Sequence, residues 1–320
     1  VQGAASIASS IVAHKGVDGI LFTGSWPVGR RILEANLDTP GRIVALELGG
    51  NNAVVVMPDA DLRQAAIEIV RCAFNTTGQR CTCTRRAIIH RDVAAKLIPA
   101  ICKAASNLII GDPRGTGGPH PTFMGPIINE AARDAVLAAQ ADFTSKAGGG
   151  RILLESTAPA SPEGGWYITP GIIEVERFVA SDSRSSAPST QHSALSSPSS
   201  SLDVEVFGPL LRVCIVDSLD QAIEQVNATS YGLAASIFTR DHAAAERFLF
   251  EVKAGCVNVN TGTAGASSKL PFGGLGLSGN HRPAGSFALD YCAYPVAGMI
   301  ERGPAATIAE GMRFEDSWLT

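Results

Sequence analysis

Short apolar runs alternate with amphipathic runs along most of this 320-residue chain. The apolar runs have the length and β-branched content of strands, and strands are predicted at 17–23, 42–48, 52–57, 84–90, 212–216, 234–239 and 256–260. Between them, apolar residues recur at helical spacing, which predicts helices at 27–36, 61–77, 93–108, 130–147, 219–227 and 242–252. Strands that alternate with helices build parallel sheets, so the sequence predicts an α/β fold with a largely parallel sheet.

Two of these helices begin at residues that commonly cap helices. Ser25 is a good N-cap, and Pro27 suits the first helical turn. Asp61 and Gln64 have the spacing of a capping box. The helix that begins after Asp61 ends before Cys81, which places this cysteine in a loop.

The composition argues against several classes of protein. A net charge of -4 gives no basic surface for nucleic acid or anionic lipid. No apolar run approaches the roughly 18 residues of a transmembrane helix, and residues 1–13 lack the basic start and strong apolar core of a signal peptide. The seven cysteines are odd in number and scattered, which favours reduced thiols in the cytoplasm or the mitochondrial matrix over a disulfide scaffold.

Residues 181–201 differ from the rest of the chain. Eleven of these 21 residues are serine, and they show almost no apolar periodicity. Such low complexity predicts a disordered insertion between two sheet elements. It could accept phosphate, but an inert insertion is the simpler interpretation.

Cys81 and Glu47 are the two side chains best suited to covalent chemistry, because each lies beside glycines that let a ligand approach the backbone. A cysteine attacks as the thiolate, which the cation of Arg80 could favour. Apolar Leu46 and Leu48 would raise the pKa of Glu47 and suit it to accept a proton from water. The plain alternatives are a small buried thiol and a carboxylate in an ion pair. No metal is predicted, because the neighbouring C-x-C pair lacks a matching cluster of ligands.

These segments resemble those of the aldehyde dehydrogenase superfamily. Leu46–Gly50 (LELGG) and Gly78–Cys81 (GQRC) look like its two signature segments, and the spacing of 81 − 47 = 34 residues is similar. Further matches follow in the family's order at 22–25 (FTGS) with Gly29, at 205–209 (EVFGP) and at 271–274 (PFGG). The resemblance implies a partial Rossmann-type dinucleotide-binding domain and an α/β catalytic domain with a parallel sheet.

The resemblance also implies a mechanism. Cys81 would attack the aldehyde carbon, hydride would pass to the nicotinamide of NAD, and a thioester would remain on Cys81. Water activated by Glu47 would then release the carboxylate. Relatives that pass the acyl group to coenzyme A lack a base at this position, so hydrolysis is expected. A cysteine hydrolase is a more distant alternative, because no histidine lies in a recognisable partner motif.

The NAD site implied by the resemblance comprises Gly24, Ser25, Gly29, Leu48, Glu205 and Phe207. Ser25 and the amides around Gly24 would meet the pyrophosphate at the start of a helix. Glu205 would hold the nicotinamide ribose hydroxyls, and Phe207 would pack near the ring. The alternative for Glu205 is a solvated carboxylate beside the serine-rich insertion. A second glycine pattern at 274–279 matches the dinucleotide fingerprint only formally, because no helix with a downstream acid follows it.

A narrower resemblance lies at 49–52 (GGNN), 79–86 (QRCTCTRR), 279–283 (GNHRP) and 290–295 (DYCAYP). These stretches resemble the N-succinylglutamate 5-semialdehyde dehydrogenases of arginine catabolism. Because that substrate carries several carboxylates, Arg80 and Arg282 are candidate substrate residues, together with Ser267. Structural ion pairs are the alternative role for each arginine.

The resemblance runs from residue 1 to about residue 300 and divides the chain into three parts. Residues 1–49 would be a remnant of the dinucleotide-binding domain, 50–283 the catalytic domain, and 284–320 an oligomerisation arm and tail. The small-molecule aldehyde is the expected partner, and the full-length protein is expected to form a homo-oligomer. Preference for NAD or NADP stays open.

The family's oxyanion-binding asparagine and its adenosine-ribose lysine lie upstream of the FTGS segment and have no counterpart here. We therefore expect an N-terminally truncated chain with little turnover, since losing one oxyanion donor costs roughly 3 kcal/mol. The alternative is a non-catalytic relative with an assembly or interaction role. Aldehyde-dependent NADH formation by the purified chain separates the two, because turnover abolished by Cys81→Ser would contradict our expectation.

Overall fold

A seven-stranded sheet organises the larger part of the computed structural model, which describes residues 1–114, 121–159, 164–180, 203–265, 267–303 and 307–320. Its strand order is β10-β9-β3-β4-β7-β6-β5, and neighbours are parallel except for β5 and β6. The strands are β3 (Asn52–Val56), β4 (Thr84–His90), β5 (Arg151–Leu154), β6 (Gly171–Glu174), β7 (Leu210–Val216), β9 (Ala234–Phe238) and β10 (Cys256–Val259). The predicted parallel α/β sheet is confirmed.

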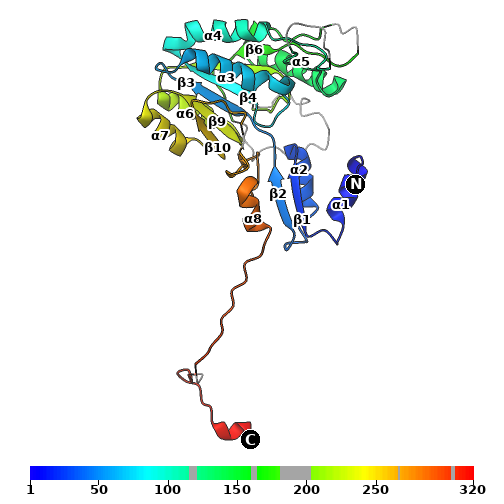
Figure 1. Cartoon of the computed structure of the whole chain (residues 1–320), viewed down its shortest axis with the longest axis vertical. Coiled ribbons are helices and arrows are strands. Elements are labelled where there is room, and N and C mark those ends of the chain that lie inside the picture. The colour runs from blue at the N-terminus through cyan, green and yellow to red at the C-terminus, as the bar shows by residue number, and fades with distance from the viewer. Residues whose placement is uncertain (115–120, 160–163, 181–202, 266, 304–306) are drawn as a thin grey trace.

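Helices cover both faces of this sheet (Figure 1). They are α3 (Leu62–Phe74) and α4 (Arg91–Ser106) on one face and α5 (Glu130–Thr144), α6 (Leu219–Asn227) and α7 (His242–Glu251) on the other. Because side chains alternate along a strand, Val54 and Val56 of β3 pack towards α3 and α4. Val55 between them packs into the opposite core. The central strands are therefore buried on both sides, as parallel strands between helices require.

A smaller unit precedes the sheet and comprises α1 (Ala5–Ala13), β1 (Gly19–Thr23), α2 (Trp26–Glu34) and β2 (Ile43–Glu47). β1 and β2 pair in parallel from Gly19 opposite Ile43 to Thr23 opposite Glu47. Helix α2 begins after Ser25, as predicted, although the Ser25 side chain makes no capping hydrogen bond.

The end of β2 contacts the polypeptide near residue 279. Glu47 forms an antiparallel bridge with Gly279, and the Leu48 N–H donates to the Ser278 carbonyl at 3.0 Å. The Leu46 N–H donates to Oδ1 of Asn280 at 2.9 Å. These bonds attach the strand that carries Glu47 to the larger part of the molecule.

Several elements were not predicted. They are β5, β6, the short antiparallel pair β8 (Tyr231–Gly232) and β11 (Leu275–Gly276), helix α8 (Ala288–Tyr291), and the 3-10 turns Asn75–Gly78, Gly285–Phe287 and Asp316–Leu319. The serine-rich insertion predicted at 181–201 lies outside the described residues. Within the described parts of the chain, no helix has the length and hydropathy needed to cross a membrane.

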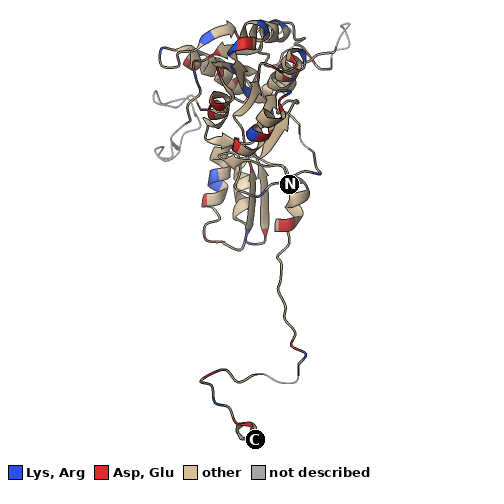
Figure 2. Ribbon diagram, turned by 90° about the vertical axis from the view of Figure 1, so that its left-hand side faces the viewer, with Lys and Arg blue, Asp and Glu red and all other residues tan. Residues whose placement is uncertain are grey.

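The chain beyond α8 extends away from the body (Figure 1). It exposes Tyr294, Val296, Met299 and Ile300, of which Met299 is 99% exposed. On the body itself, acidic and basic residues are interspersed (Figure 2). The apolar side chains of the extended segment therefore lack the packing that the sheet gives to the rest of the chain.

The predicted capping box at the start of α3 forms only in part. Asp61 accepts a hydrogen bond from the Gln64 N–H at 3.0 Å, as expected. The Gln64 side chain does not return the bond and instead donates to the Asn260 carbonyl at 2.8 Å. Gln64 therefore joins α3 to the end of β10, a long-range role that the local pattern could not reveal.

We expect Asp61→Ala to lower the free energy of unfolding by about 1 kcal/mol, because the Gln64 N–H loses its acceptor at the start of α3. Asp61→Asn keeps an acceptor oxygen and is the matched control. Urea denaturation followed by circular dichroism measures both. Equal loss in the alanine and asparagine variants would show that the cap contributes nothing.

Candidate active site

Cys81 lies in a loop between α3 and β4, as the sequence predicts. The turn before it has left-handed backbone at Thr76, Thr77 and Gly78, with φ values of 52°, 56° and 68°. A Cβ at Gly78 would overlap the carbonyl of Gly208, so only glycine fits there. This turn directs the chain from the helix end back across the sheet and into the loop.

Asn52 at the start of β3 holds the backbone on both sides of the thiol. Its side-chain NH₂ donates to the carbonyl of Cys81 at 2.7 Å and to the carbonyl of Cys83 at 2.8 Å. Its Oδ1 accepts from the Ala234 N–H at 3.0 Å. Asn52 is 2% exposed, so these bonds are shielded from water and join β3, β9 and the loop into one unit.

Arg85 holds the loop from the other side. Its guanidinium donates to the carbonyls of Gly78 at 2.7 Å, Arg80 at 3.0 Å and Gly208 at 3.0 Å. The guanidinium carbon also lies 5.6 Å from the centre of the Phe207 ring. Arg85 is 1% exposed and so ties the cysteine loop to the segment that carries Glu205 and Phe207.

The structure brings Glu47 and Glu205 into electrostatic contact with Cys81. Burial raises the pKa of the Cys81 thiol, and the two carboxylates raise it further. The pKa of Glu47 is also raised by burial, as its apolar neighbours predict, while the Ala284 N–H donates to its Oε1 at 3.2 Å. The surroundings therefore favour the protonated form of the thiol, and the neighbouring Glu47 carboxylate is a stronger base than an exposed one.

Arg80 adjoins the thiol, and its cation could favour the Cys81 thiolate if it pointed inward. The pKa of this thiol is raised, first by burial and then by Glu205 and Glu47. Arg80 is exposed, and its charge acts on Cys83 instead, where it opposes the larger effect of burial. Arg80 lines the cavity over Cys81, whereas the buried Arg85 donates to the carbonyls of the loop.

Glu205 is half-buried and not the solvated carboxylate of the alternative interpretation. Its Oε1 accepts from the Gly50 N–H at 3.0 Å, and its carboxyl group packs directly on Gly49, where a Cβ would overlap it. Burial raises the pKa of Glu205, and the nearby charge of Arg85 opposes that effect. The LELGG segment thus supplies both Glu47 and the glycines against which the second carboxylate packs.

A cavity of about 820 Å³ lies over Cys81. Its lining includes the predicted Gly24, Ser25, Arg80, Cys81, Glu205 and Phe207. It also includes Gln79, Thr82, Ala264, Gly265 and Phe272, which had no assigned role. Gln79, Thr82 and Phe272 lie within the matched segments GQRC, QRCTCTRR and PFGG, and these segments were the signal in the sequence that could have found them.

The remaining predicted residues lie elsewhere. Gly29 and Leu48 are buried against each other, since a Cβ at Gly29 would lie 2.9 Å from Leu48. Arg282 lines a separate cavity of about 230 Å³, together with Leu46 and His281. Ser267 is exposed, and its carbonyl accepts from the Leu270 N–H at 3.1 Å. Gly29 and Leu48 therefore pack against each other and are not among the residues that line the large cavity.

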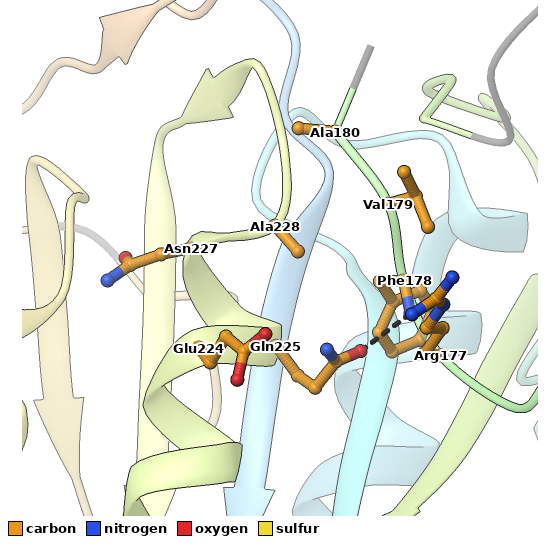
Figure 3. Close-up of a pocket in the computed structure, with 8 residues that line it drawn as sticks. All are labelled: Arg177, Phe178, Val179, Ala180, Glu224, Gln225, Asn227 and Ala228. Carbon is orange, nitrogen blue, oxygen red and sulfur yellow. Dashed lines mark hydrogen bonds between the residues drawn. The ribbon is translucent and has the colours of Figure 1, made fainter.

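Another hollow of about 480 Å³ lies between the chain after β6 and the end of α6 (Figure 3). Gln225 accepts from the Phe178 N–H at 2.6 Å at its edge, and Arg177 and Glu224 also line it. Among the described residues that line it, there is neither a thiol nor a pair of carboxylates. The cavity over Cys81 combines a thiol with the carboxylate of Glu205.

Comparison with known proteins identifies the class to which this arrangement belongs. The family model described as "Aldehyde dehydrogenase family" matches residues 1–181 and 192–295. The chain therefore belongs to the aldehyde dehydrogenase family. It is 37% identical over 313 residues to an N-succinylglutamate 5-semialdehyde dehydrogenase of Sphingopyxis alaskensis and 40% identical over 309 residues to that of Novosphingobium aromaticivorans.

These matches cover 98% and 95% of this chain but only 60% and 59% of the two relatives. Among solved structures, betaine aldehyde dehydrogenase of Staphylococcus aureus in complex with NAD⁺ has a TM-score of 0.76 at 25% identity, with 91% of this chain and 53% of that chain covered. PnpE in complex with nicotinamide adenine dinucleotide has a TM-score of 0.75 at 29% identity, with 88% and 53% covered. The chain spans little more than half of the length of these proteins.

We expect Arg85→Met to lower the free energy of unfolding by roughly 3 kcal/mol, because three carbonyls around the loop lose their donor. Arg30→Met is the control, since Arg30 makes an exposed ion pair with Glu34 and its loss should cost below about 1 kcal/mol. Urea denaturation measures both. Similar losses would mean that Arg85 does not hold the loop.

We expect Glu205→Gln to lower the pKa of Cys81, because the variant removes a negative charge that disfavours the thiolate. Cys81 should then react with iodoacetamide at lower pH than in the unmodified chain, as peptide mass spectrometry can measure. Cys102 is the internal control, because burial raises its pKa without a carboxylate. An unchanged Cys81 profile, or a shift of both cysteines, would contradict the expectation.

Proposed function

We propose that this chain carries the acyl-forming and acyl-releasing groups of an NAD-dependent aldehyde dehydrogenase. The supporting observation is the position of Cys81 in a cavity of about 820 Å³ with Glu205, and within the electrostatic reach of Glu47. The Cys81 sulfur adds to the aldehyde carbon, which converts the carbonyl oxygen to an oxyanion and sends the thiol proton to a neighbouring base. NAD, when bound, accepts the hydride from that carbon, and a thioester remains on Cys81.

Glu47 is proposed to act as the base that releases the product. It takes a proton from a water molecule, whose oxygen attacks the thioester carbon, and the Cys81 sulfur leaves. Burial raises the pKa of Glu47. Glu47 is therefore a stronger base than an exposed carboxylate and is better suited to take a proton from water. The Ala284 N–H donates to one of its oxygens, and the other is proposed to accept the proton of the water.

The peptide between Arg80 and Cys81 supports a role in oxyanion binding. Its carbonyl points to Arg85, and the described residues contain no cis peptide bond. In a trans peptide the N–H points opposite to the carbonyl, so the Cys81 N–H points away from Arg85. We propose this N–H as a donor to the oxyanion, a role in which preorganised amides are effective.

The residues present fit a dinucleotide at one end of the cavity. Gly24 and Ser25 line it at the start of α2, and the N-terminus of a helix favours a pyrophosphate. The Gly24 N–H itself donates to the Glu47 carbonyl at 3.0 Å. The Ser25 side chain is not used for capping and can bond a phosphate oxygen. Glu205 and Phe207 line the same cavity and are proposed to hold the nicotinamide ribose and ring. The two NAD complexes with similar folds favour NAD as the cofactor.

For the substrate we propose N-succinylglutamate 5-semialdehyde, and with it a role in arginine catabolism. The names of the relatives at 37–41% identity support this choice. Arg80 lines the cavity and is exposed, so it is proposed to bind one carboxylate of the substrate. Arg282 lines the separate cavity of about 230 Å³, and Ser267 lies two residues after Gly265 of the large cavity's wall; both are kept as proposed substrate residues.

We also propose the domain division 1–49, 50–283 and 284–320. The separate β1–β2 sheet and the seven-stranded sheet support the first boundary. The exposed apolar side chains of the last segment, such as Tyr294 and Met299, support an oligomerisation arm, because such surfaces usually meet a partner. The same segment supports the alternative proposal, in which a chain without catalytic turnover has an assembly role.

A cytoplasmic location is proposed from the seven free cysteines.

The proposed chemistry predicts a thioester on Cys81 that persists without Glu47. After p-nitrophenyl acetate is added, Glu47→Gln should accumulate acetyl-Cys81 at least about tenfold above the unmodified chain, because removing a general base slows hydrolysis by such factors. Peptide mass spectrometry measures the adduct. Cys81→Ser should remove it, and Cys102→Ser, a half-buried cysteine on α4, should not.

Acetylation elsewhere in the chain, with Cys81 unmodified, would overturn the proposal. The substrate is tested separately by NADH formation with N-succinylglutamate 5-semialdehyde and with simple aliphatic aldehydes. Preference for the aliphatic compounds would reject the assigned substrate and leave the thioester chemistry standing.

A further inference from the structure

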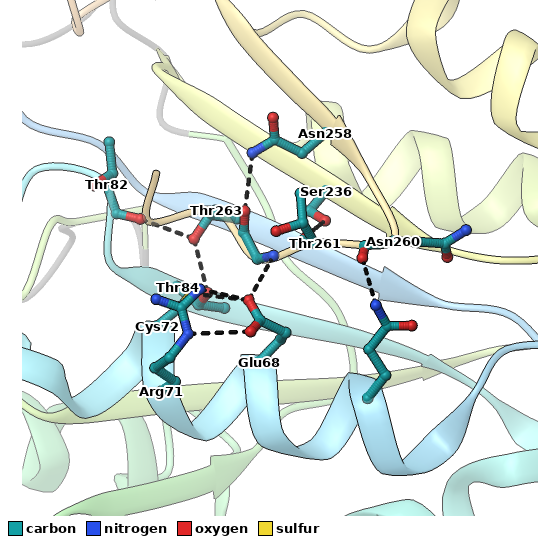
Figure 4. Close-up of polar contacts among 12 residues, drawn as sticks. Glu68, Arg71, Cys72, Thr82, Thr84, Ser236, Asn258, Asn260, Thr261 and Thr263 are labelled. Atoms are coloured by element: carbon teal, nitrogen blue, oxygen red, sulfur yellow. Dashed lines mark hydrogen bonds and ion pairs between the residues drawn. The ribbon is translucent and has the colours of Figure 1, made fainter. Parts of the chain in front are cut away.

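Thr263 lies at the centre of a buried chain of three threonines (Figure 4). It is 0% exposed, and its hydroxyl oxygen lies 2.8 Å from the Thr82 carbonyl and 2.8 Å from the Thr84 hydroxyl. A carbonyl can only accept and a hydroxyl has one proton. Thr263 therefore donates to Thr82, and Thr84 donates to Thr263.

This hydroxyl connects two walls of the cavity that are 181 residues apart in sequence. Thr82 directly follows Cys81, and both line the cavity. Thr263 directly precedes Ala264 and Gly265, which line it as well. The Thr263–Thr82 bond is thus a direct polar link between the thiol's loop and the wall formed by Ala264 and Gly265.

The turn that ends in Thr263 is itself anchored. The Gly262 N–H donates to Glu68 of α3 at 2.9 Å, and Asn258 of β10 donates to the Gly262 carbonyl at 2.9 Å. Glu68 is held in turn by Arg71 at 2.6 Å (Figure 4). A Cβ at Gly262 would overlap the sulfur of Cys72, so the turn packs tightly on α3.

A second anchor holds the residue before this turn, because the Ser236 hydroxyl of β9 donates to the Thr261 carbonyl. Residues 261 and 262 are therefore attached to α3, β9 and β10. Thr263 transfers this fixed position to the loop that carries the thiol, because its hydroxyl donates to the buried Thr82 carbonyl. A buried carbonyl that loses its donor is costly.

We propose that Thr263 is a positioning residue that sets the gap between Cys81 and the wall of Ala264 and Gly265, and thereby limits the size of the electrophile that reaches the thiol. The inference rests on the proposed function only in treating Cys81 as the nucleophile. The Thr263 hydroxyl, which is buried and lies outside the reacting groups, thereby has a part in substrate selection.

The test compares the rate at which Cys81 reacts with iodoacetamide and with the bulkier N-phenyliodoacetamide, followed by peptide mass spectrometry on the intact chain. Thr263→Val keeps the side-chain shape but leaves the Thr82 carbonyl and the Thr84 hydroxyl without Thr263. We expect the bulky-to-small rate ratio to rise roughly fivefold, the factor that loss of one hydrogen bond supports. Thr263→Ser keeps the hydroxyl and should keep the ratio of the unmodified chain.

Two matched variants separate positioning from general loss of stability. Thr239 is 2% exposed and its hydroxyl bonds Asp59, so Thr239→Val removes a comparable buried bond away from the cavity and should leave the ratio unchanged. Thr84→Val removes a hydroxyl from the same chain but keeps the Thr263–Thr82 bond, and should also leave the ratio near that of the unmodified chain. Thr263→Ala replaces the valine variant if the latter does not fold.

An unchanged ratio in Thr263→Val and Thr263→Ala, or an equal rise in Thr239→Val, would overturn the proposal. Because the labelling requires neither NAD nor turnover, its result is independent of the acetyl-adduct experiment. A rise in the ratio without acetyl-Cys81 would keep the positioning role and reject the thioester chemistry. If Cys81 resists even iodoacetamide, both proposals fail.

Discussion

The site depends on buried side chains that satisfy the backbone carbonyls of one short loop. Asn52 bonds the carbonyls of Cys81 and Cys83, Arg85 bonds that of Arg80, and Thr263 bonds that of Thr82. Buried carbonyls without partners are costly, so each donor stabilises one conformation of the loop. Because the donors come from β3, β4 and the turn after β10, the loop can adopt this shape only when the sheet has assembled.

The same arrangement explains why a charged residue lies in the core. Arg85 is buried with three carbonyl partners and an aromatic ring, a set that replaces much of the hydration of a guanidinium. Its charge also opposes the effect of burial on Glu205. One side chain therefore supports the backbone of the thiol's loop and the charge state of the carboxylate opposite to it.

Sequence patterns predicted helices and strands well where apolar residues recurred at helical or strand spacing over a long, uninterrupted run. The strand at 84–90 and the helix at 219–227 have the bounds that were predicted, whereas β5 and β6 are only four residues each and were missed. Local reasoning chose Arg80 because it adjoins the thiol, but the fold exposes it and buries Arg85. Asn52 and Thr263 could not be found from spacing, since their partners depend on strand register and on a turn at the far end of the chain.

The raised pKa of Cys81 bears on how readily this thiol is oxidised. Peroxide reacts with thiolates far faster than with thiols, and the products beyond sulfenic acid cannot be reversed by ordinary reductants. Burial and two carboxylates raise the pKa of this sulfur, which lowers the fraction of it that is present as thiolate at a given pH. The same groups therefore lower the rate at which peroxide oxidises Cys81.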